Sequence, residues 1–479
     1  MTPKRPVNAT RWLALAPLLF IGAAITPATG QTTQSAPARI ALAEDPMEIR
    51  SLGLSVRLPV GARLDTSSIG ASNASFTLFS EDNTWIMRLH SPKSRDRELT
   101  TVEVAEGLIE EMKATRAKSG RIAEGESKSG VELIDRADNL LINGVRASRF
   151  YAKIARGDGA KLVSGYTVFP LSPGQFAIFQ LDCIDAEFDR ARSAYETVLA
   201  TVAITDPAEL AADRAAGLLT GDRLLAQFNG EDLLNMLPPT AQFYRLYRPS
   251  SDGLEGDEQE VAYQVVEMRR GQRGELDPRK PKSRWMQADR DWGIIATVKA
   301  RFLDGQRLVD SESVFFLSLD RSNEAWSIHM AVKRGKDAAI FTETGAREGD
   351  AIEVNIIQPG QPQVTKRWRK PPEGYLSQVE TLLLPFMLAR TGAETEFAFY
   401  TYQPQHNDIM LRRDTFERSD RPGEWMQITR PSEDAALDRT ALDADGLIVR
   451  KQLASGVVME AVKFDRLLSI WRSKGLPTE

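Results

Sequence analysis

The stretch WSIHMAVK, residues 326–333, decides the fold of the second half of this 479-residue chain. Apolar side chains occupy every second position from Trp326 to Val332, with small or polar ones between them. Because successive side chains of a β-strand point to opposite faces, this alternation predicts a strand with one buried face. The pattern recurs at residues 296–302 and 352–356. Turn sequences indicate hairpins at residues 304–305, 320–323 and 445–446.

One amphipathic helix interrupts these strands, over GYLSQVETLLLPFMLAR, residues 374–390. Gly392 is a natural stop, because glycine readily adopts the left-handed conformation that ends many helices. About ten strands joined by hairpins, with one helix for the concave side, predict a curved antiparallel sheet or half-barrel over residues 239–479. A last helix is predicted over 465–474. The side chains expected to cover the groove of the sheet are Tyr375, Val379, Leu382, Leu383 and Phe386.

This half resembles the LolA-like half-barrel families of exported proteins. The resemblance rests on the regular spacing of strands and turns, the helix GYLSQVETLLLP, and the hairpin LDADGLIVRKQLASGVVMEAVKF at residues 442–464. It implies a mainly-β half-barrel, and the families include lipoprotein carriers. The helix lies later in the domain here than in those carriers.

The first half, residues 47–206, alternates between strands and helices. Strand patterns begin at Ile49, a capping box of Thr100 and Glu103 opens a helix, and Asn143-Gly144 is a hairpin turn. The order is strands, helix, strands, helix and strand. It predicts an α+β domain with helices packed against an antiparallel sheet.

The first half also resembles the PsbP and DcrB-like families. The segments that carry the resemblance are SLGLSVRLP (51–59), NGVRASRFYAKI (143–154), YTVFPLSPGQFAIFQL (166–181) and VAITDP (202–207). Members are mostly non-enzymatic exported or lumenal proteins, and some are assembly factors. The resemblance therefore implies export and no catalytic motif.

The first thirty residues are typical of a secretory signal peptide. Lys4, Arg5 and Arg11 precede an apolar run over 12–25. As a helix the run would span about 21 Å, short of the ~30 Å apolar core of a membrane. Cleavage is expected between Gly30 and Gln31, which predicts a periplasmic or secreted protein without a transmembrane anchor.

Two polar or helical stretches are expected to connect the folded parts. Residues 31–46 are small, polar and contain proline, which predicts a disordered tether. Residues 207–238 predict a linker of short helices, interrupted at Gly217, Gly221 and Gly230.

Composition limits the partners and the chemistry. The formal net charge is −5, and cleavage removes three basic and no acidic side chains, so the mature chain is more acidic still. An acidic protein is a poor match for nucleic acid. The single cysteine, Cys183, excludes an internal disulfide and a lipid-anchored cysteine after the signal, and its apolar strand predicts burial.

No catalytic, metal or cofactor site is expected, and we predict that the chain is not an enzyme. The three histidines, His90, His329 and His406, are far apart in sequence, and no zinc-binding spacing includes them. No nucleophile elbow and no glycine-rich phosphate loop occur. His329 lies on the polar side of its strand, which predicts a solvated ring.

Two basic segments, 269–285 and 366–370, are the strongest local anomaly. They suggest contact with anionic lipid, an envelope polymer or an acidic partner, and the alternative is a pair of solvated loops. The binding hypothesis requires that the two segments share one face. The residues of this predicted patch are Arg269, Arg270, Arg273, Arg279, Lys280, Lys282, Arg284, Arg367, Trp368 and Arg369.

Two functions remain open. In the first, the half-barrel of an exported, non-catalytic protein holds a hydrophobic ligand or a lipid-modified partner. In the second, both domains are interaction surfaces of an envelope complex with no small ligand. A helix at 375–390 that covers an unfilled groove favours the first hypothesis, and a helix that fills the concavity favours the second.

Overall fold

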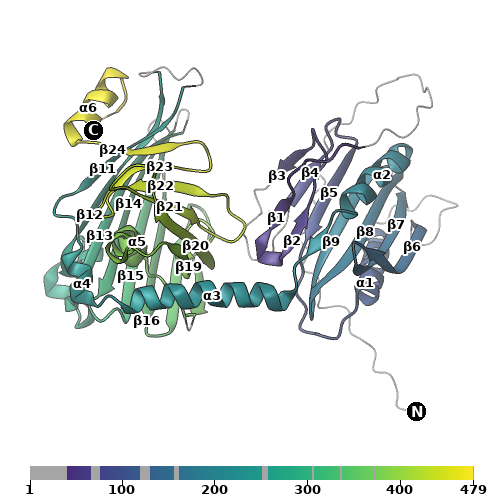
Figure 1. The fold of residues 1–479 in the computed structure, drawn as a ribbon, viewed down its shortest axis with the longest axis horizontal. Helices are drawn as coiled ribbons and strands as arrows, with labels where there is room; N and C mark the ends of the chain where they lie inside the picture. The colour runs from purple at the N-terminus through teal and green to yellow at the C-terminus, as the bar shows by residue number, and fades with distance from the viewer. Residues whose placement is uncertain are drawn as a thin grey trace, which may run out of the picture. The chain divides into compact units, whose positions relative to one another are not determined.

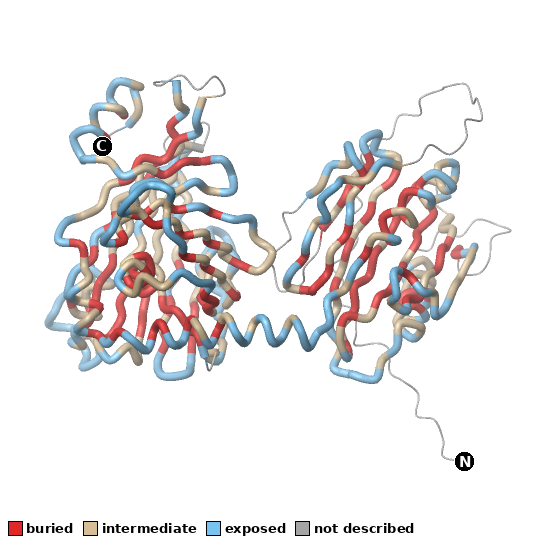
Figure 2. The backbone as a smooth tube through the Cα atoms, viewed as in Figure 1, coloured by how far each residue is buried: buried red, intermediate tan, exposed pale blue. Residues whose placement is uncertain are grey.

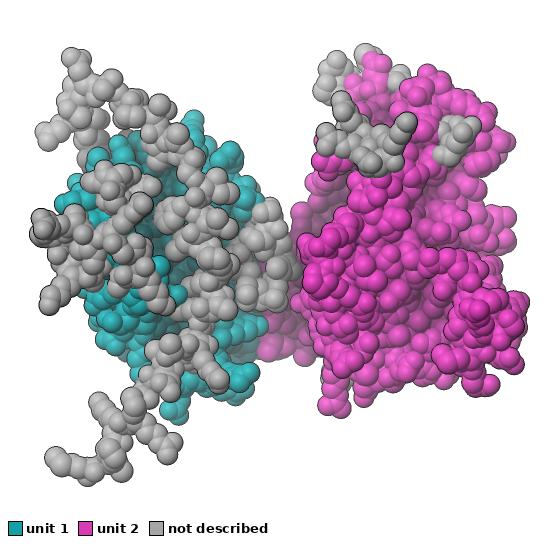
Figure 3. Space-filling model, turned by 180° about the vertical axis from the view of Figure 1, so that it is seen from behind, with its two compact units in different colours: residues 1–210 teal, residues 211–479 magenta. Residues whose placement is uncertain are grey.

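The computed structural model describes residues 40–65, 76–118, 130–155, 161–250, 257–304, 307–334, 337–371 and 373–477. The predicted signal peptide, with its cleavage site at Gly30 and Gln31, lies outside these residues. The chain divides into two compact units between Leu210 and Ala211, shown in separate colours in Figure 3. Each unit is described by itself.

The first unit is built on a seven-stranded antiparallel sheet with the strand order β3-β4-β5-β9-β8-β7-β6 (Figure 1). A three-stranded sheet, β1-β2-β10, and two helices complete the unit. The strands of the large sheet are β3 (Arg63–Asp65), β4 (Phe76–Phe79), β5 (Trp85–His90), β6 (Val131–Ile142), β7 (Val145–Ala155), β8 (Lys161–Ser172) and β9 (Gln175–Ile184). The other elements are β1 (Met47–Ile49), β2 (Leu54–Val56), β10 (Ala203–Ile204), α1 (Thr101–Lys118) and α2 (Phe188–Leu199).

Helices α1 and α2 cover opposite faces of the seven-stranded sheet. Ile178 of β9 belongs to the hydrophobic cluster that contains Leu108 of α1, whereas its neighbour Phe179 belongs to the cluster that contains Tyr195 of α2. Successive strand residues point to opposite faces, so the two helices lie on different sides. The Tyr195 hydroxyl donates to the carbonyl of Phe179 at 2.8 Å. The predicted packing of helices against an antiparallel sheet is confirmed.

The disordered tether predicted over residues 31–46 is in part a folded segment, where the structure describes it. The amide of Ala43 donates to Leu58, and the amide of Val60 donates to Ala41, at 2.8 and 2.9 Å. Leu42 also packs against the hydrophobic core. Residues 41–43 are therefore held beside residues 58–60. The cause is Leu42, an apolar residue within the polar stretch that is stabilised by packing against the core. The prediction of a tether up to residue 46 is wrong for this part.

The second unit contains a fourteen-stranded antiparallel sheet. Its order is β18-β17-β16-β15-β14-β13-β12-β11-β24-β23-β22-β21-β20-β19, so β18 and β19 are the two edges. The first eight strands are β11 (Gln242–Arg248), β12 (Gln259–Gln272), β13 (Trp292–Asp304), β14 (Arg307–Ser318), β15 (Asn323–Arg334), β16 (Asp337–Glu348), β17 (Ala351–Ile357) and β18 (Val364–Arg369). The others are β19 (Thr395–Gln403), β20 (Asp408–Arg418), β21 (Trp425–Arg430), β22 (Asp438–Leu442), β23 (Ile448–Gln452) and β24 (Val458–Ala461). The predicted large antiparallel sheet is confirmed.

This sheet bends around helix α5 (Gln378–Thr391). The helix lies against β13 and β14 and also against the edge strand β19. The ring of Tyr402 on β19 lies 5.1 Å from Trp326 on β15 and 5.8 Å from Trp368 on β18. Side chains therefore bring the two edge strands close together, although these strands are not paired. Figure 2 shows the buried positions gathered on the strands around α5.

Local sequence explains the limits of α5. Ser377 accepts from the amide of Glu380, whose side chain accepts from the amide of Ser377 in return. Gly392 ends the helix with a φ of 60°, as its position in the sequence predicts. The last helix, α6 (Phe464–Ser473), also lies where the sequence predicts it.

The predicted linker belongs mostly to the second unit. Helix α3 (Pro207–Ala226) continues through Gly217 and Gly221, and α4 (Gly230–Asn235) follows. A Cβ atom at Gly221 would lie 2.2 Å from the carbonyl oxygen of Ala398, so glycine permits close contact with β19. The prediction that Gly217 and Gly221 interrupt the helix is wrong, because tertiary packing outweighs the low helix propensity of glycine.

Candidate functional site

The fourteen-stranded sheet has two faces of different chemistry. We call the face that carries Trp326 and packs against α5 the inner face, and the opposite face the outer face. Trp326, Leu383 of α5 and Val354 of β17 belong to one hydrophobic cluster on the inner face. The outer face of β15 to β17 carries short polar side chains, including Ser327 and Asn355.

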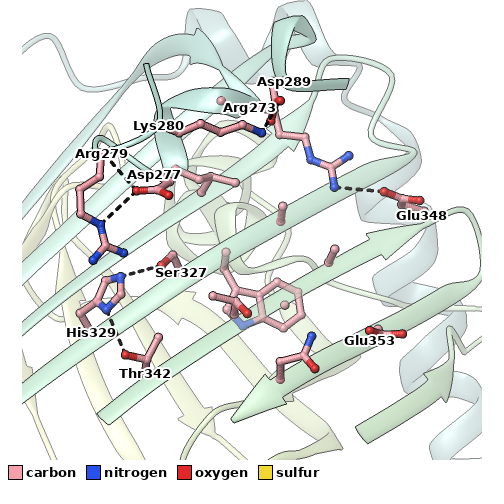
Figure 4. Close-up of a pocket in the computed structure, with 18 of the residues that line it drawn as sticks. Arg273, Asp277, Arg279, Lys280, Asp289, Ser327, His329, Thr342, Glu348 and Glu353 are labelled. Carbon is pink, nitrogen blue, oxygen red and sulfur yellow. Dashed lines mark hydrogen bonds and ion pairs between the residues drawn. The ribbon is translucent and has the colours of Figure 1, made fainter. Parts of the chain in front are cut away.

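A groove of about 640 Å³ lies on the outer face, and we call it the outer groove (Figure 4). Its floor consists of β15, β16 and β17. Its roof is the segment 273–291 between β12 and β13, which contains the short 3-10 helices η4 (Arg273–Leu276), η5 (Lys282–Arg284) and η6 (Ala288–Arg290). The volume is in the range of small-molecule sites, ~300–1,000 Å³.

The roof segment has a defined conformation. A Cβ atom at Gly274 would lie 2.5 Å from the Trp285 ring, so only glycine lets this indole pack on η4. The Trp285 indole nitrogen donates to the carbonyl of Lys280 at 3.2 Å. Glu275 caps η4 by accepting from the amide of Gln272 at 2.8 Å. These contacts hold the roof as a folded element.

Each cation in the outer groove has an acidic partner. Lys280 pairs with Asp289 at 2.6 Å, and this hydrogen bond lowers the pKa of Asp289. Two further pairs lie at the rims, where they are more exposed (Figure 4). They join Arg273 to Glu348 at 3.0 Å and Arg279 to Asp277 at 3.3 Å.

His329 lies on the floor of the outer groove. Its Nε2 is 3.0 Å from the hydroxyl of Ser327, and its Nδ1 is 3.3 Å from that of Thr342 (Figure 4). The ring is partly buried rather than solvated, because the roof covers this side of the strand. The ring therefore lies on the predicted polar side of its strand and lines the groove, but it is partly covered and not fully solvated.

The two basic segments predicted from the sequence meet at this groove. Arg367 of β18 donates to Glu353, a groove residue, at 2.7 Å, so both segments reach the outer face. Carboxylates pair with Arg269, Arg273, Arg279, Lys280 and Arg367. In the part of the chain that the structure describes, no ion pair involves Arg270, Lys282, Arg284 or Arg369.

The aromatic member of the predicted patch is not part of that surface. Trp368 faces inward, where its indole nitrogen donates to Asp408 at 3.2 Å. The alternation along β18 places this ring on the inner face with Tyr402. The outer surface is thus a mixture of both charges, and contact with an anionic partner stays a prediction.

The predicted helix fills part of the inner face. Val379 and Leu383 are 1% and 0% exposed, Tyr375 is buried, and Leu382 and Phe386 are partly buried. Tyr375 lies just before α5, where it bridges to Tyr400 of β19. The side chains of α5 therefore occupy the concavity around Trp326.

Farther along the strands, the inner face carries more apolar side chains beyond the α5 cluster, and the polar Ser311 lies among them opposite Met330. Strand registers place Phe302, Val309 and Val332 side by side, and Met330 opposite Phe341. These five residues form what we call the inner patch. Val332 lies six residues, about 20 Å, along its strand from Trp326. Phe302 is 36% exposed, the other four are partly exposed, and no member belongs to the cluster of described residues around α5.

A buried ionic network lies at the opposite end of the inner face. The Tyr375 hydroxyl donates to Glu324 at 2.7 Å, and Nε of Arg347 lies 3.8 Å from the other Glu324 oxygen. Burial raises the pKa of Glu324 to about 7, against the opposing effect of Arg347. A small pocket of about 330 Å³ adjoins the network.

Arg321 connects this network to the helices. It lies in a left-handed turn with a φ of 60° and donates to Glu380 at 2.6 Å. The same guanidinium donates to the carbonyls of Leu225 and Phe228 at 2.7 and 2.8 Å. It therefore ties the β14–β15 turn to α5 and to the end of α3. The arrangement is that of a structural clamp.

Other sequence expectations concern single residues. Cys183 is buried, and burial raises its pKa to about 12, which makes the thiol unreactive. Burial lowers the pKa of His90. Among the described residues, no group of three or more His, Cys, Asp or Glu side chains is arranged to hold a metal. No helix in the described ranges has the length and apolar character to cross a membrane.

Comparisons with known proteins give distant structural similarities. No protein-family model matches, and no curated protein matches. A β-barrel-like protein of the domain of unknown function DUF1849 from Brucella abortus shares 11% identity, with 47% of this chain and 95% of that chain covered and a TM-score of 0.31. The cyanobacterial PsbP of Synechocystis shares 14% identity over 37% of this chain and 99% of that one, with a TM-score of 0.25.

A third solved structure, from Bacteroides thetaiotaomicron, shares 11% identity over 38% of this chain and 64% of that one, with a TM-score of 0.20. The PsbP-like resemblance inferred from the sequence thus has a counterpart among solved structures. The LolA-like resemblance stays a prediction. TM-scores this low carry no information about function.

Proposed function

We propose that this chain is an exported, non-catalytic binding protein. In this proposal the second unit holds an apolar group on the inner patch, such as the acyl chain of a lipid or of a lipid-modified partner. The observation that supports it is the run of partly exposed apolar side chains that continues past α5. Full burial of a side chain such as Phe or Met stabilises by roughly 1.5–3 kcal/mol, so covering five of them would supply useful binding energy.

Export rests on the sequence of residues 1–30, and the absence of catalysis rests on the lack of a recognisable catalytic arrangement. The outer groove pairs its charges with one another, and the Glu324 network is engaged in holding turns and helices. In the outer groove the Ser327 hydroxyl does lie 3.0 Å from His329 Nε2, but the other ring nitrogen of His329 faces the Thr342 hydroxyl and not a carboxylate that would orient the ring as a base.

The test is native mass spectrometry of the protein purified from its own envelope. We expect a co-purifying amphiphile that is lost from the Met330→Lys and Phe341→Lys variants, because a buried ammonium group opposes apolar contact. Ile340→Lys is the matched control, since Ile340 is adjacent to Phe341 but lies on the outer face and is 60% exposed. A wild-type mass with no bound amphiphile would refute the proposal.

The scaffold hypothesis is the second candidate, and the complete burial of Leu383 and Val379 favours it. If α5 alone completes the inner face, the purified protein carries no amphiphile and its partners are proteins. Crosslinking in the intact envelope would then recover stable protein neighbours, with equal yield from the wild type and Met330→Lys.

A further inference from the structure

We propose that the outer groove is a separate binding site and that its ligand is a neutral oligosaccharide. The groove lies on the opposite face of the sheet from the inner patch. This inference therefore does not depend on the proposed function.

The charges in the groove do not favour an anion. Three cationic residues line it, Arg273, Arg279 and Lys280, together with four carboxylates, Asp277, Asp289, Glu348 and Glu353. Each of these cations is already paired with one of the carboxylates. An anionic ligand would meet the carboxylates as well as the cations, so charge alone gives it no net attraction.

The donors and acceptors in the groove favour hydroxyl groups. Lysine and arginine only donate hydrogen bonds, and ionised carboxylates only accept them. Both kinds lie side by side along the walls, at Lys280 with Asp289 and at Arg273 with Glu348. A ligand hydroxyl both donates and accepts, so it satisfies either neighbour. A chain of sugar rings offers such groups at every position, whereas a peptide offers alternating amide donors and carbonyl acceptors.

The floor provides groups of the same kind. Thr344 carries a hydroxyl and Asn355 carries an amide. Ser327 and Thr342 also carry hydroxyls, each in contact with one nitrogen of His329. The Asn355 oxygen accepts from Thr365 at 2.6 Å, which leaves its amide nitrogen to donate to a ligand. These side chains lie on the neighbouring strands β15, β16 and β17, so hydroxyl and amide groups are spread across the floor.

The groove also has apolar lining and an adaptable rim. Leu276, Ala325 and Ala346 line it and would contact the C–H faces of sugar rings. The Arg279 side chain is 80% exposed, and its contact with Asp277 is a surface ion pair. Exposed pairs of this kind add little stability, so Arg279 can reorient onto a ligand at low cost.

The experiment is saturation-transfer NMR on the full chain with four probes. Three are neutral, namely cellotetraose, maltotetraose and chitotetraose, and tetragalacturonate is the anionic comparison. We expect transfer to at least one neutral tetrasaccharide and a weaker signal from tetragalacturonate. Loss of one hydrogen bond in Asn355→Leu or Thr344→Val should raise the dissociation constant about two-fold to ten-fold.

Thr297→Val is the matched control, because Thr297 lies on the outer face of β13 away from the groove and should leave binding unchanged. Met330→Lys, which disrupts the inner patch, should also bind the sugar normally, so failure of the proposed function is distinguishable. Three results would overturn the inference: no transfer to any neutral tetrasaccharide, a stronger signal from tetragalacturonate than from every neutral probe, or unchanged affinity in both groove variants.

Discussion

The two faces of the fourteen-stranded sheet are made in different ways. The inner face can be recognised within a single strand. In β15, every second position is apolar, at Trp326, Ile328, Met330 and Val332. The outer groove is assembled from separate segments, because its roof, residues 273–291, lies between β12 and β13, whereas its floor begins at Asn323 of β15. The alternation of apolar and polar residues along one strand is enough to predict which face of the sheet is packed. A groove on the opposite face cannot be predicted in this way, because it depends on which distant segment folds over that face.

The largest expected effect tests whether α5 fills the inner face. Leu383→Ala removes a side chain that is 0% exposed and leaves a cavity, which should cost roughly 2–5 kcal/mol of unfolding free energy. Urea unfolding followed by tryptophan fluorescence measures it, because most tryptophans lie in the second unit. Ile340→Ala on the outer face is the control, with a change of at most ~0.5 kcal/mol. Equal costs at the two positions would contradict the comparison.

The buried Glu324 network is expected to make the stability of the folded protein depend on pH. Burial raises the folded-state pKa of Glu324 from 4.5 to about 7, so the folded protein holds this proton more tightly than the unfolded chain. Its contribution to stability is therefore complete below pH 4.5 and is lost as pH rises through 7, by on the order of 3 kcal/mol.

Glu324→Gln should remove this part of the pH dependence, because glutamine does not titrate. The measurement is the urea midpoint of both proteins between pH 4.5 and 8. Parallel curves for the variant and the wild type would show that Glu324 does not carry the effect.

A smaller effect tests whether α3 is a linker or part of the inner packing. In an exposed helix Gly→Ala stabilises by up to ~1 kcal/mol. At Gly221 the added Cβ would lie 2.2 Å from a backbone oxygen of β19, so Gly221→Ala should instead destabilise by roughly 1–3 kcal/mol.

Gly107→Ala on α1 is the matched control, since among the described residues no atom apart from the adjoining helix backbone and chain neighbours lies within 4 Å of the added Cβ. This variant should be as stable as the wild type or more so. If Gly221→Ala destabilises the protein and Gly107→Ala does not, α3 is packed against β19 as the structure shows. A stabilised Gly221→Ala variant would instead favour the linker interpretation. Thermal unfolding of each variant measures the sign.

The smallest effect concerns the ion pairs of the outer groove. Arg273 and Glu348 are joined at 3.0 Å, but the Glu348 side chain is 67% exposed. A double-mutant cycle with Arg273→Ala and Glu348→Ala should give a coupling energy of only ~0–1 kcal/mol. A much larger coupling would mean that charge, rather than the packing of Trp285 on Gly274, holds the roof in place.

The sequence predicted the strands of the second unit, α5 and its ends, and the helix-on-sheet packing of the first unit, because each leaves a periodic or capping pattern. The sequence also predicts a feature that the sequence analysis did not use. Glu324 lies two positions before Trp326, so the alternation places its carboxylate on the apolar face of the strand. The outer groove could not be predicted, since Ser327, Thr342 and Asn355 resemble any solvated strand surface. Gly217 and Gly221 misled the prediction because their role is set by β19, about 180 residues away.

The pairing of β11 with β24 places the first and last strands of the second unit beside each other in the middle of the sheet. A chain that stops before residue 458 therefore lacks a central strand, not a peripheral one. The two strands that pair with β24, namely β11 and β23, would be left with unpaired backbone hydrogen-bonding groups. Unpaired strand edges promote pairing with other chains and aggregation. During synthesis the eight strands from β11 to β18 can form hairpins as they emerge, but the sheet becomes continuous only when the last strand arrives. In this unit the last strand, β24, is the one that joins the two parts of the sheet.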